Sequence, residues 1–270
     1  MSAAVRLPAV AGQFYPGKPE VLKREVENYI QSEGQKIAAL GCLVPHAGYM
    51  YSGHVAGAVF GRLELPRRFV MMCPNHTGRG EPLAVMSTGE WLTPLGRAAI
   101  DEELAQALKR NCDLLAEDSM AHRREHGLEV QLPFLQKLQP GFSFVPITVG
   151  TGRYEWLEAL GAAIAVTLAG LQERVLVVAS SDMNHYESEE ITRIKDKRAL
   201  DCILALDPRA LYEAITRQHI TMCGFGPAIA MLTAAIRAGA THAEVIKYAT
   251  SGDVSGERDQ VVGYAGVAVG

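Results

Sequence analysis

Apolar residues follow two different spacings along this chain. Short apolar runs bounded by turn residues are typical of buried strands, whereas apolar positions three and four residues apart are typical of helices. The first pattern predicts strands over residues 39–45, 67–73, 82–88, 91–95, 143–149, 174–180, 243–249 and 260–269. The second predicts helices over residues 18–32, 53–63, 97–110, 121–138, 153–172, 190–205, 207–217 and 224–238.

This order of elements predicts the fold class. Strands that alternate with helices favour a largely parallel sheet with helices on both faces, and the closely spaced strands between 67 and 95 can pair antiparallel. We therefore predict an α/β fold, a three-layer α/β/α domain around a mostly parallel or mixed sheet. Because the chain has no repeat and no Pro/Ser-rich linker, residues 1–270 are predicted to form one domain. Residues 1–17 carry two prolines and two glycines and are expected to form an extended N-terminal arm.

The composition of the chain argues against nucleic acid and membranes as binding partners. The net charge of −4 gives no electrostatic attraction to nucleic acid, and no apolar run approaches the ~20 residues that span a bilayer. The first residues lack the long apolar stretch of a secretory signal. The five scattered cysteines are typical of free thiols in a reducing compartment. We expect a cytoplasmic protein that binds neither nucleic acid nor membrane.

Three histidines follow three of the predicted strands. His46 comes after the run 39–45, His76 after 67–73 and His185 after 174–180. In an open α/β sheet, ligands bind in the crevice outside the carboxyl ends of the strands. The three histidines therefore predict one shared pocket, suited to a metal or to acid–base chemistry.

Two further segments carry polar groups that could join this pocket. In the run Ser180–Tyr186, Asp182 can orient a neighbouring imidazole and His185 can act as a general acid or base, although Asp182 could equally cap the following helix. Cys223 precedes a predicted helix, where its thiolate is favoured as a metal ligand or nucleophile. The alternative for Cys223 is a buried structural thiol.

The sequence also contains a formal H-x-x-E-H match. On a helix, this spacing would place His122 and His126 on one face to bind zinc, with Glu125 as the base of a hydrolase. Gly127 and Pro133 argue against a long regular helix here. Glu125 and His126, together with Glu129, remain candidate pocket residues.

Taken together, these segments resemble the Memo family. The matching stretches are AVAGQFYP at 9–16, VPHAGY at 44–49, YSG at 51–53, PNHTG at 74–78, EHGLEVQLPF at 125–134, SSD at 180–182 with HY at 185–186, and CGFGP at 223–227. They keep their order along the whole chain, which makes the resemblance far more specific than any single motif. One departure is Gly127, where the family pattern has serine.

The resemblance implies a fold like that of the class III extradiol ring-cleaving dioxygenases, which use non-heme Fe(II). It implies a metal site formed by His46, His76 and Cys223, with His185 as the catalytic histidine and Asp182 beside it. Fe(II) is the expected metal, and the soft thiolate also suits Cu or Zn. The expected pocket residues are Tyr49, Asn75, Glu125, His126, Glu129 and Ser181.

Three functions follow as hypotheses. The first is an iron-dependent redox enzyme related to the extradiol dioxygenases, acting on an unknown small molecule or peptide. The second is a regulatory protein that binds a metal, peptide or metabolite in the same pocket without turnover. The third is a zinc hydrolase that uses His122, Glu125 and His126. A homo-oligomer is compatible with each of them.

Overall fold

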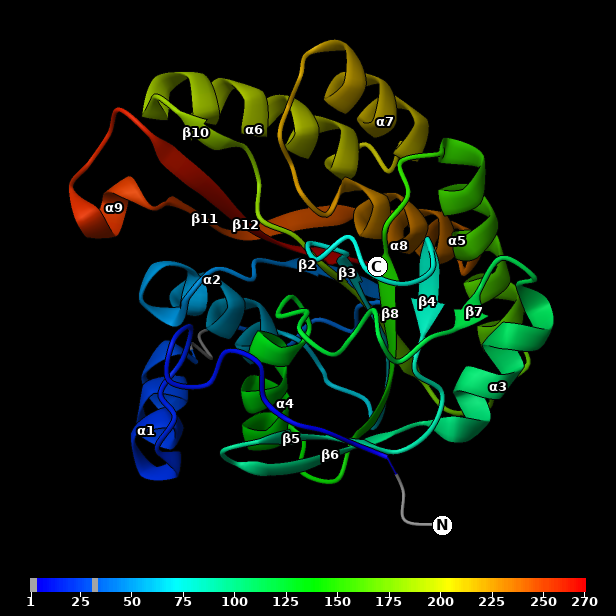
Figure 1. Cartoon of the computed structure of the whole chain (residues 1–270). Coiled ribbons are helices and arrows are strands. Elements are labelled where there is room, and N and C mark those ends of the chain that lie inside the picture. Colours follow the sequence, from blue (N-terminus) through cyan, green and yellow to red (C-terminus); the bar gives the residue numbers. More distant parts are fainter. Residues whose placement is uncertain (1–3, 31–33) are drawn as a thin grey trace.

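The computed structural model describes residues 4–30 and 34–270, and its centre is a mixed β-sheet (Figure 1). In these residues the sheet has twelve strands, of which nine follow the order β1-β5-β6-β8-β3-β9-β2-β12-β10. The strands on this path are β1 (Val5–Arg6), β5 (Glu90–Thr93), β6 (Gly96–Ile100), β8 (Ser143–Val149), β3 (Arg68–Pro74), β9 (Val175–Ser180), β2 (Gly41–Val44), β12 (Val261–Val269) and β10 (His185–Glu187). Off this path, β11 (Ala243–Thr250) pairs with β12, β4 (Leu83–Val85) with β8, and β7 (Ala116–Glu117) with β4.

Helices cover both faces of the sheet. One face packs against α1 (Pro19–Tyr29), α2 (Tyr49–Arg62) and α4 (Leu132–Leu138). The other packs against α3 (Glu102–Asn111), α5 (Tyr154–Ala169), α6 (Glu189–Leu204), α7 (Pro208–Arg217) and α8 (Phe225–Arg237). The short α9 (Gly252–Ser255) follows β11, and a 3-10 turn, η1 (Glu129–Gln131), precedes α4. This arrangement confirms the three-layer α/β/α prediction.

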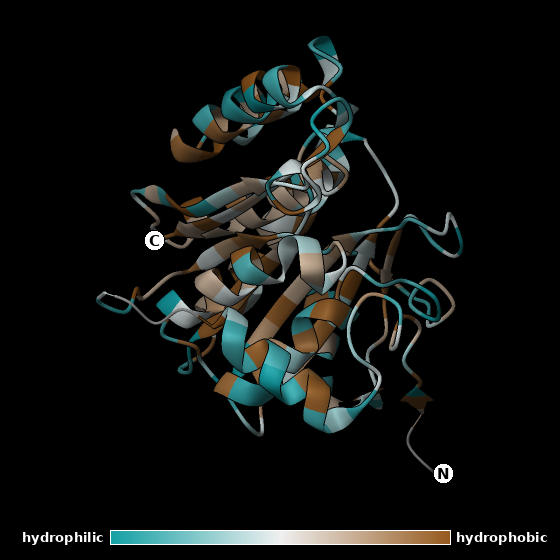
Figure 2. Ribbon diagram, turned by 90° about the vertical axis from the view of Figure 1, so that its left-hand side faces the viewer, coloured by the Kyte–Doolittle hydropathy of each residue, from teal (hydrophilic) through white to brown (hydrophobic). Residues whose placement is uncertain are grey.

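Side chains alternate between the two cores along the central strands. On β3, Val70 and Met72 pack towards α5 and α8, whereas Phe69, Met71 and Cys73 pack towards the opposite helices. This is the two-residue period of a strand that is buried on both faces. Figure 2 shows the result, with apolar colours along the strands and hydrophilic colours gathered on the outer helices and loops. None of the helices in the described residues has the length and apolar character needed to cross a bilayer.

The strands that matter for the candidate site are parallel neighbours. β9 pairs in parallel with both β2 and β3, so the three strands end at the same edge of the sheet. Their last residues are Val44, Pro74 and Ser180. The chain segments that follow therefore converge, as predicted for His46 and His76.

Three predicted helix boundaries need correction. The helix predicted over 97–110 begins only at Glu102, because residues 96–100 pair as β6 and Asp101 caps the N–H of Leu104. The helix predicted over 53–63 begins earlier, at Tyr49. The helix predicted over 121–138 was wrong in its first half: residues 121–128 form turns and irregular backbone, and regular helix starts at Leu132. The predicted end of the first helix at 31–32 lies outside the described residues.

The described part of the N-terminal arm, residues 4–17, is packed onto the sheet and does not project from it. Val5 and Arg6 form β1, which pairs in parallel with β5. The Arg6 guanidinium donates to the buried Glu129 carboxylate at 2.8 Å. The same carboxylate accepts the backbone N–H groups of Ala9 and Val10 and the hydroxyl of Tyr15. Glu129 is therefore the anchor of the arm.

We expect Glu129→Gln to destabilise the protein by roughly 3–5 kcal/mol, because it leaves the buried Arg6 charge without its counter-ion. The measurement is the free energy of unfolding in urea. The control is Asp201→Asn in the exposed pair of Lys197 and Asp201, which should change stability by less than about 1 kcal/mol. Equal effects of the two substitutions would contradict the anchoring role.

Candidate metal centre

Three side chains that could bind a metal converge at the carboxyl edge of the parallel strands. His46 lies two residues beyond β2, and His76 lies two residues beyond β3. Cys223 does not follow a strand: it lies two residues before the start of α8. Their potential ligand atoms all lie within 4.8 Å of one another, and we call these three residues the His46/His76/Cys223 cluster. The structure thus brings together the three residues expected from the family resemblance.

His46 is buried, and its ring is oriented by a hydroxyl group. Nδ1 lies 2.9 Å from Oγ of Ser180, and this hydroxyl donates its one proton to the carbonyl oxygen of Gly127. Ser180 must therefore accept a hydrogen bond from His46, which assigns the proton of the neutral ring to Nδ1. The lone pair of Nε2 then faces Sγ of Cys223 at 3.2 Å. Burial, followed by the nearby His76, lowers the pKa of His46 to about 3, which keeps the ring neutral.

His76 is held by a buried carboxylate. Glu125 accepts a hydrogen bond from Nδ1 of His76 at 2.8 Å and another from the backbone N–H of His76 at 2.7 Å. Burial by itself raises the pKa of Glu125, but the hydrogen bond and charge of His76 and the N–H of Gly127 outweigh it and bring the pKa to about 2. Because Nδ1 is engaged, Nε2 is the nitrogen of His76 that remains for a ligand. A carboxylate behind a histidine is a common arrangement at metal sites.

Cys223 reaches the cluster because the chain passes very close to the end of β9. A Cβ atom on the next residue, Gly224, would lie 2.4 Å from the carbonyl oxygen of Ser180, so only glycine fits there. The backbone N–H of Asp182 donates to Sγ of Cys223 at 3.3 Å. Burial and the charge of Asp182 raise the pKa of this thiol. The prediction that the thiolate of Cys223 is favoured at the start of this helix was therefore wrong.

Asp182 and His185 border the same cluster. Oδ1 of Asp182 accepts the backbone N–H of His46 at 2.7 Å, and burial raises the pKa of this carboxyl. Asp182 does not cap the next helix, because Ser188 caps α6. Nδ1 of His185 lies 2.9 Å from the carbonyl oxygen of Thr221 and donates to it, so Nε2 is free to exchange a proton.

His126 joins the centre on its outer side. Its ring centroid lies 4.5 Å from that of His76 and 5.3 Å from that of His46, and Phe14 of the arm packs against it at 4.8 Å. Burial is the main cause that lowers the pKa of His126 to about 4. With His76 and Glu125 it forms a second group that could hold a metal.

The other expected pocket residues hold neighbouring segments of the chain in place. Tyr49 donates its hydroxyl to the carbonyl oxygen of Val130 and packs in the core, and Glu129 anchors the arm. Asn75 orders the turn after β3, where its side-chain oxygen accepts the N–H and hydroxyl of Thr77. Ser181 accepts the N–H of Gly224 at 2.8 Å and so fixes the start of α8 beside Cys223.

The arrangement that the H-x-x-E-H match would need is not formed. His122 lies in a turn, not on a helix, and its buried ring packs against Trp91 with a centroid distance of 5.7 Å. Within residues 4–30 and 34–270, neither group of converging potential ligands includes His122. The geometry therefore removes the basis of the zinc-hydrolase hypothesis.

Two residues that orient the cluster could not be identified from the sequence. Ser180 fixes the ring of His46, and Gln131 donates to Oγ of Ser180 at 3.1 Å and to the carbonyl oxygen of Pro45 at 2.7 Å. Both lie inside stretches that resemble the Memo family. Nothing in their residue type or spacing distinguishes them from ordinary buried polar residues.

The fold and the cluster define an α/β protein with two histidines and a cysteine at the carboxyl edge of a parallel sheet. A family model described as "Memo-like protein" matches residues 6–268, and the chain belongs to this family. It is 42% identical over 267 residues to a MEMO1 family protein of Methanosarcina barkeri, covering 98% of this chain and 100% of that one. It is 43% identical over 263 residues to one of Archaeoglobus fulgidus, covering 97% and 98% respectively.

A solved structure shares the fold. An uncharacterized protein from Escherichia coli K12 superposes with a TM-score of 0.61 over 85% of this chain and 99% of the other. The two sequences are 14% identical, so this likeness concerns the fold alone.

The buried ring of His122 makes stability depend on pH. Burial, followed by the charge of Arg6, lowers its pKa to about 4 from the value of 6.5 in the unfolded chain. The unfolded state therefore binds the proton first as pH falls, and stability is lost from about pH 6.5 downwards. Between pH 7 and 5, His122→Leu should lose about 2 kcal/mol less than the unaltered protein.

The measurement is urea unfolding at both pH values on metal-free protein. The exposed His242 supplies the control, because His242→Leu should leave the pH dependence unchanged. An unchanged pH dependence in His122→Leu would contradict a buried neutral imidazole.

Proposed function

We propose that this protein is a metal-binding member of the Memo family that holds Fe(II) through His46, His76 and Cys223. The observation that carries the proposal is the orientation of the two imidazoles. Ser180 engages Nδ1 of one ring and Glu125 engages Nδ1 of the other, so both Nε2 atoms are left as donors beside the thiol.

The chemistry of the donors fits a transition metal. Imidazole nitrogen and thiolate sulfur bind Fe, Zn and Cu, whereas Mg²⁺ and Ca²⁺ need oxygen ligands. Fe(II) is proposed first, from the family's resemblance to non-heme iron dioxygenases, and Zn and Cu are the competitors. A bound dication would also favour the thiolate of Cys223, because its charge opposes the effects that raise the pKa of the thiol.

We further propose a redox reaction on a small molecule. Bound iron would supply one-electron and O₂ chemistry at the centre. His185 would transfer a proton through Nε2, while Thr221 holds its Nδ1–H and keeps the ring in one tautomer. Asp182 would keep His46 in place through the backbone N–H.

The second candidate function is binding without turnover. In the extradiol dioxygenases a carboxylate completes the ligand set, and in the proposed site Cys223 would take that position. A thiolate is oxidisable and softer than a carboxylate, which favours a metal- or metabolite-binding regulatory protein. The free thiols Cys42, Cys73, Cys112, Cys202 and Cys223 fit the proposed cytoplasmic location for either function.

The ligand set is tested by anaerobic reconstitution with Fe(II), Zn(II) or Cu(I), followed by metal analysis. The unaltered protein should bind about one equivalent, and Cys223→Ala should lower the affinity by roughly 100-fold or more, because it removes the one anionic ligand. Cys202→Ala, in a partly buried thiol on α6, is the matched control and should bind as before. Unchanged metal content in Cys223→Ala would exclude this ligand set.

Turnover distinguishes the enzyme from the regulatory protein. The iron-loaded protein is mixed with catechol-type substrates and O₂, and the consumption of O₂ is recorded. An enzyme should lose about 100-fold or more of its rate in His185→Gln with its iron content unchanged, whereas the exposed His242→Gln should keep its rate. Bound iron with no O₂ consumption on any of these substrates would favour the regulatory function.

A further inference from the structure

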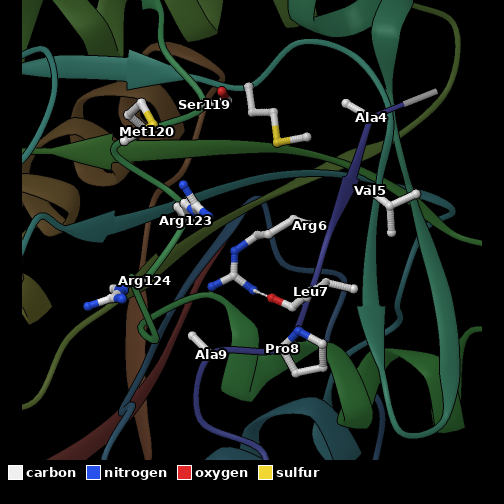
Figure 3. Close-up of a pocket in the computed structure, with 11 residues that line it drawn as sticks. Ala4, Val5, Arg6, Leu7, Pro8, Ala9, Ser119, Met120, Arg123 and Arg124 are labelled. Carbon is white, nitrogen blue, oxygen red and sulfur yellow. Dashed lines mark hydrogen bonds between the residues drawn. The ribbon is translucent and has the colours of Figure 1, made fainter. Parts of the chain in front are cut away.

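A pocket separate from the His46/His76/Cys223 cluster lies between the N-terminal arm and the segment 119–124 (Figure 3). Its volume is about 880 Å³, which is in the range of small-molecule sites. We call it the arm pocket. The residues that line it are Ala4, Val5, Arg6, Leu7, Pro8, Ala9, Met86, Ser119, Met120, Arg123 and Arg124.

The charge of the arm pocket is positive. Arg123 and Arg124 are exposed, and neither has an ion-pair partner in the described part of the chain. Figure 3 shows both on the side of β1 towards which Arg6 extends. Arg6 itself is neutralised by Glu129 and contributes no free charge. No acidic side chain is among the lining residues, although the whole chain carries a net charge of −4.

The two carboxylates that flank the segment are already occupied. Glu125 accepts hydrogen bonds from His76, and Asp118 accepts the backbone N–H of Met120 through Oδ1 and that of Glu81 through Oδ2. Asp118 therefore orders the loop that begins the segment 119–124. Two neighbouring arginines without a counter-ion favour the binding of an anionic group.

The rest of the arm pocket is apolar and partly open to water. Leu7 is 65% exposed and Met120 is 49% exposed, and Val5, Pro8 and Met86 complete the apolar part. Exposed apolar surface beside unpaired charges is typical of a binding site for an amphipathic ligand.

The wall formed by the arm is rigid. Arg6 donates through Nε to the carbonyl oxygen of His122 at 2.7 Å, and its guanidinium stacks over the ring of Trp91 at 4.0 Å. The arm and the segment 119–124 are therefore tied together, and the pocket between them is preformed. A preformed site loses less entropy when it binds a ligand.

We propose that the arm pocket binds a small organic anion with an apolar body, in which a carboxylate or phosphate group lies between Arg123 and Arg124. The apolar body contacts Leu7, Met86 and Met120. This site is independent of the metal centre and of the function proposed for it.

The methionines provide a direct readout. Protein labelled with ¹³C in the methionine methyl groups is titrated with hexanoate and with hexyl phosphate, and the methyl signals are recorded by NMR. Signals of Met86 and Met120, assigned by Met→Leu substitution, should shift in a saturable manner. Met50 is 60% exposed and outside the arm pocket, so its signal should stay in place. Comparing the two anions identifies the preferred charged group.

Uncharged and cationic probes test the charge requirement. Hexan-1-ol and hexylammonium should bind at least about tenfold more weakly than the better anion, and added salt should weaken the binding of the anion. Arg123→Gln and Arg124→Gln should each weaken it about threefold to tenfold. The exposed Arg110 of α3 is the matched control, and Arg110→Gln should have no effect.

The proposal is overturned if neither anion shifts the signals of Met86 and Met120, or if hexan-1-ol shifts them equally at the same concentration. Equal anion affinity in Arg123→Gln, Arg124→Gln and the unaltered protein would also overturn it. Cys223→Ala should bind the anion normally, so failure of the metal site and failure of the arm pocket can be distinguished.

Discussion

The hydrogen bonds between the buried Glu125 carboxylate and His76 are the interactions on which the metal centre depends. Glu125 is removed from water, and its ionised form is stable there only because His76 and Gly127 donate to it. These bonds fix both the backbone and the ring of His76. Since Gly127 also accepts the hydroxyl proton of Ser180, the same short segment determines the orientation of His46.

Gly127 shows why this segment is not a regular helix. A Cβ atom there would lie 2.8 Å from Cβ of Cys73 on β3, so the segment packs against the strand more closely than a side chain allows. A serine at this position would need the strand or the segment to move. Close packing here lets Glu125 bond to His76, which follows the same strand.

The sequence predicts the fold well where the apolar periodicity is strong. β8 has the predicted bounds, and α7 begins within one residue of its prediction, because burial on a regular face sets both. The helix predicted for residues 121–128 is not formed, because their conformation depends on contacts with residues that are distant in the sequence. Arg6 bonds to the carbonyl oxygen of His122, 116 positions away, and no local pattern reports such a contact.

The same distinction applies to the site. His46 and His76 could be found because strand ends are visible in the sequence and the edge of a parallel sheet gathers them. Glu125 and Glu129 are the same residue type, but their roles differ. Glu125 orients His76, whereas Glu129 binds Arg6, which lies 123 positions away. Which carboxylate belonged to the centre depended on tertiary contacts that spacing does not encode.

Burial also sets the charge that the centre can accept. Without a cation, His46 is neutral, the thiol of Cys223 is protonated, and Glu125 carries a negative charge that the hydrogen bonds from His76 stabilise. A dication bound by the cluster would meet two neutral imidazoles, one thiolate and the nearby Glu125. The buried Asp182 carboxyl, which accepts the backbone N–H of His46, is a further acidic group beside the cluster. Buried acidic groups that lie close together repel one another when they ionise, and a bound cation offsets this repulsion more strongly the higher its charge. The burial of these carboxyl and thiol groups therefore favours a divalent ion over a monocation, in addition to the preference set by the identity of the ligands.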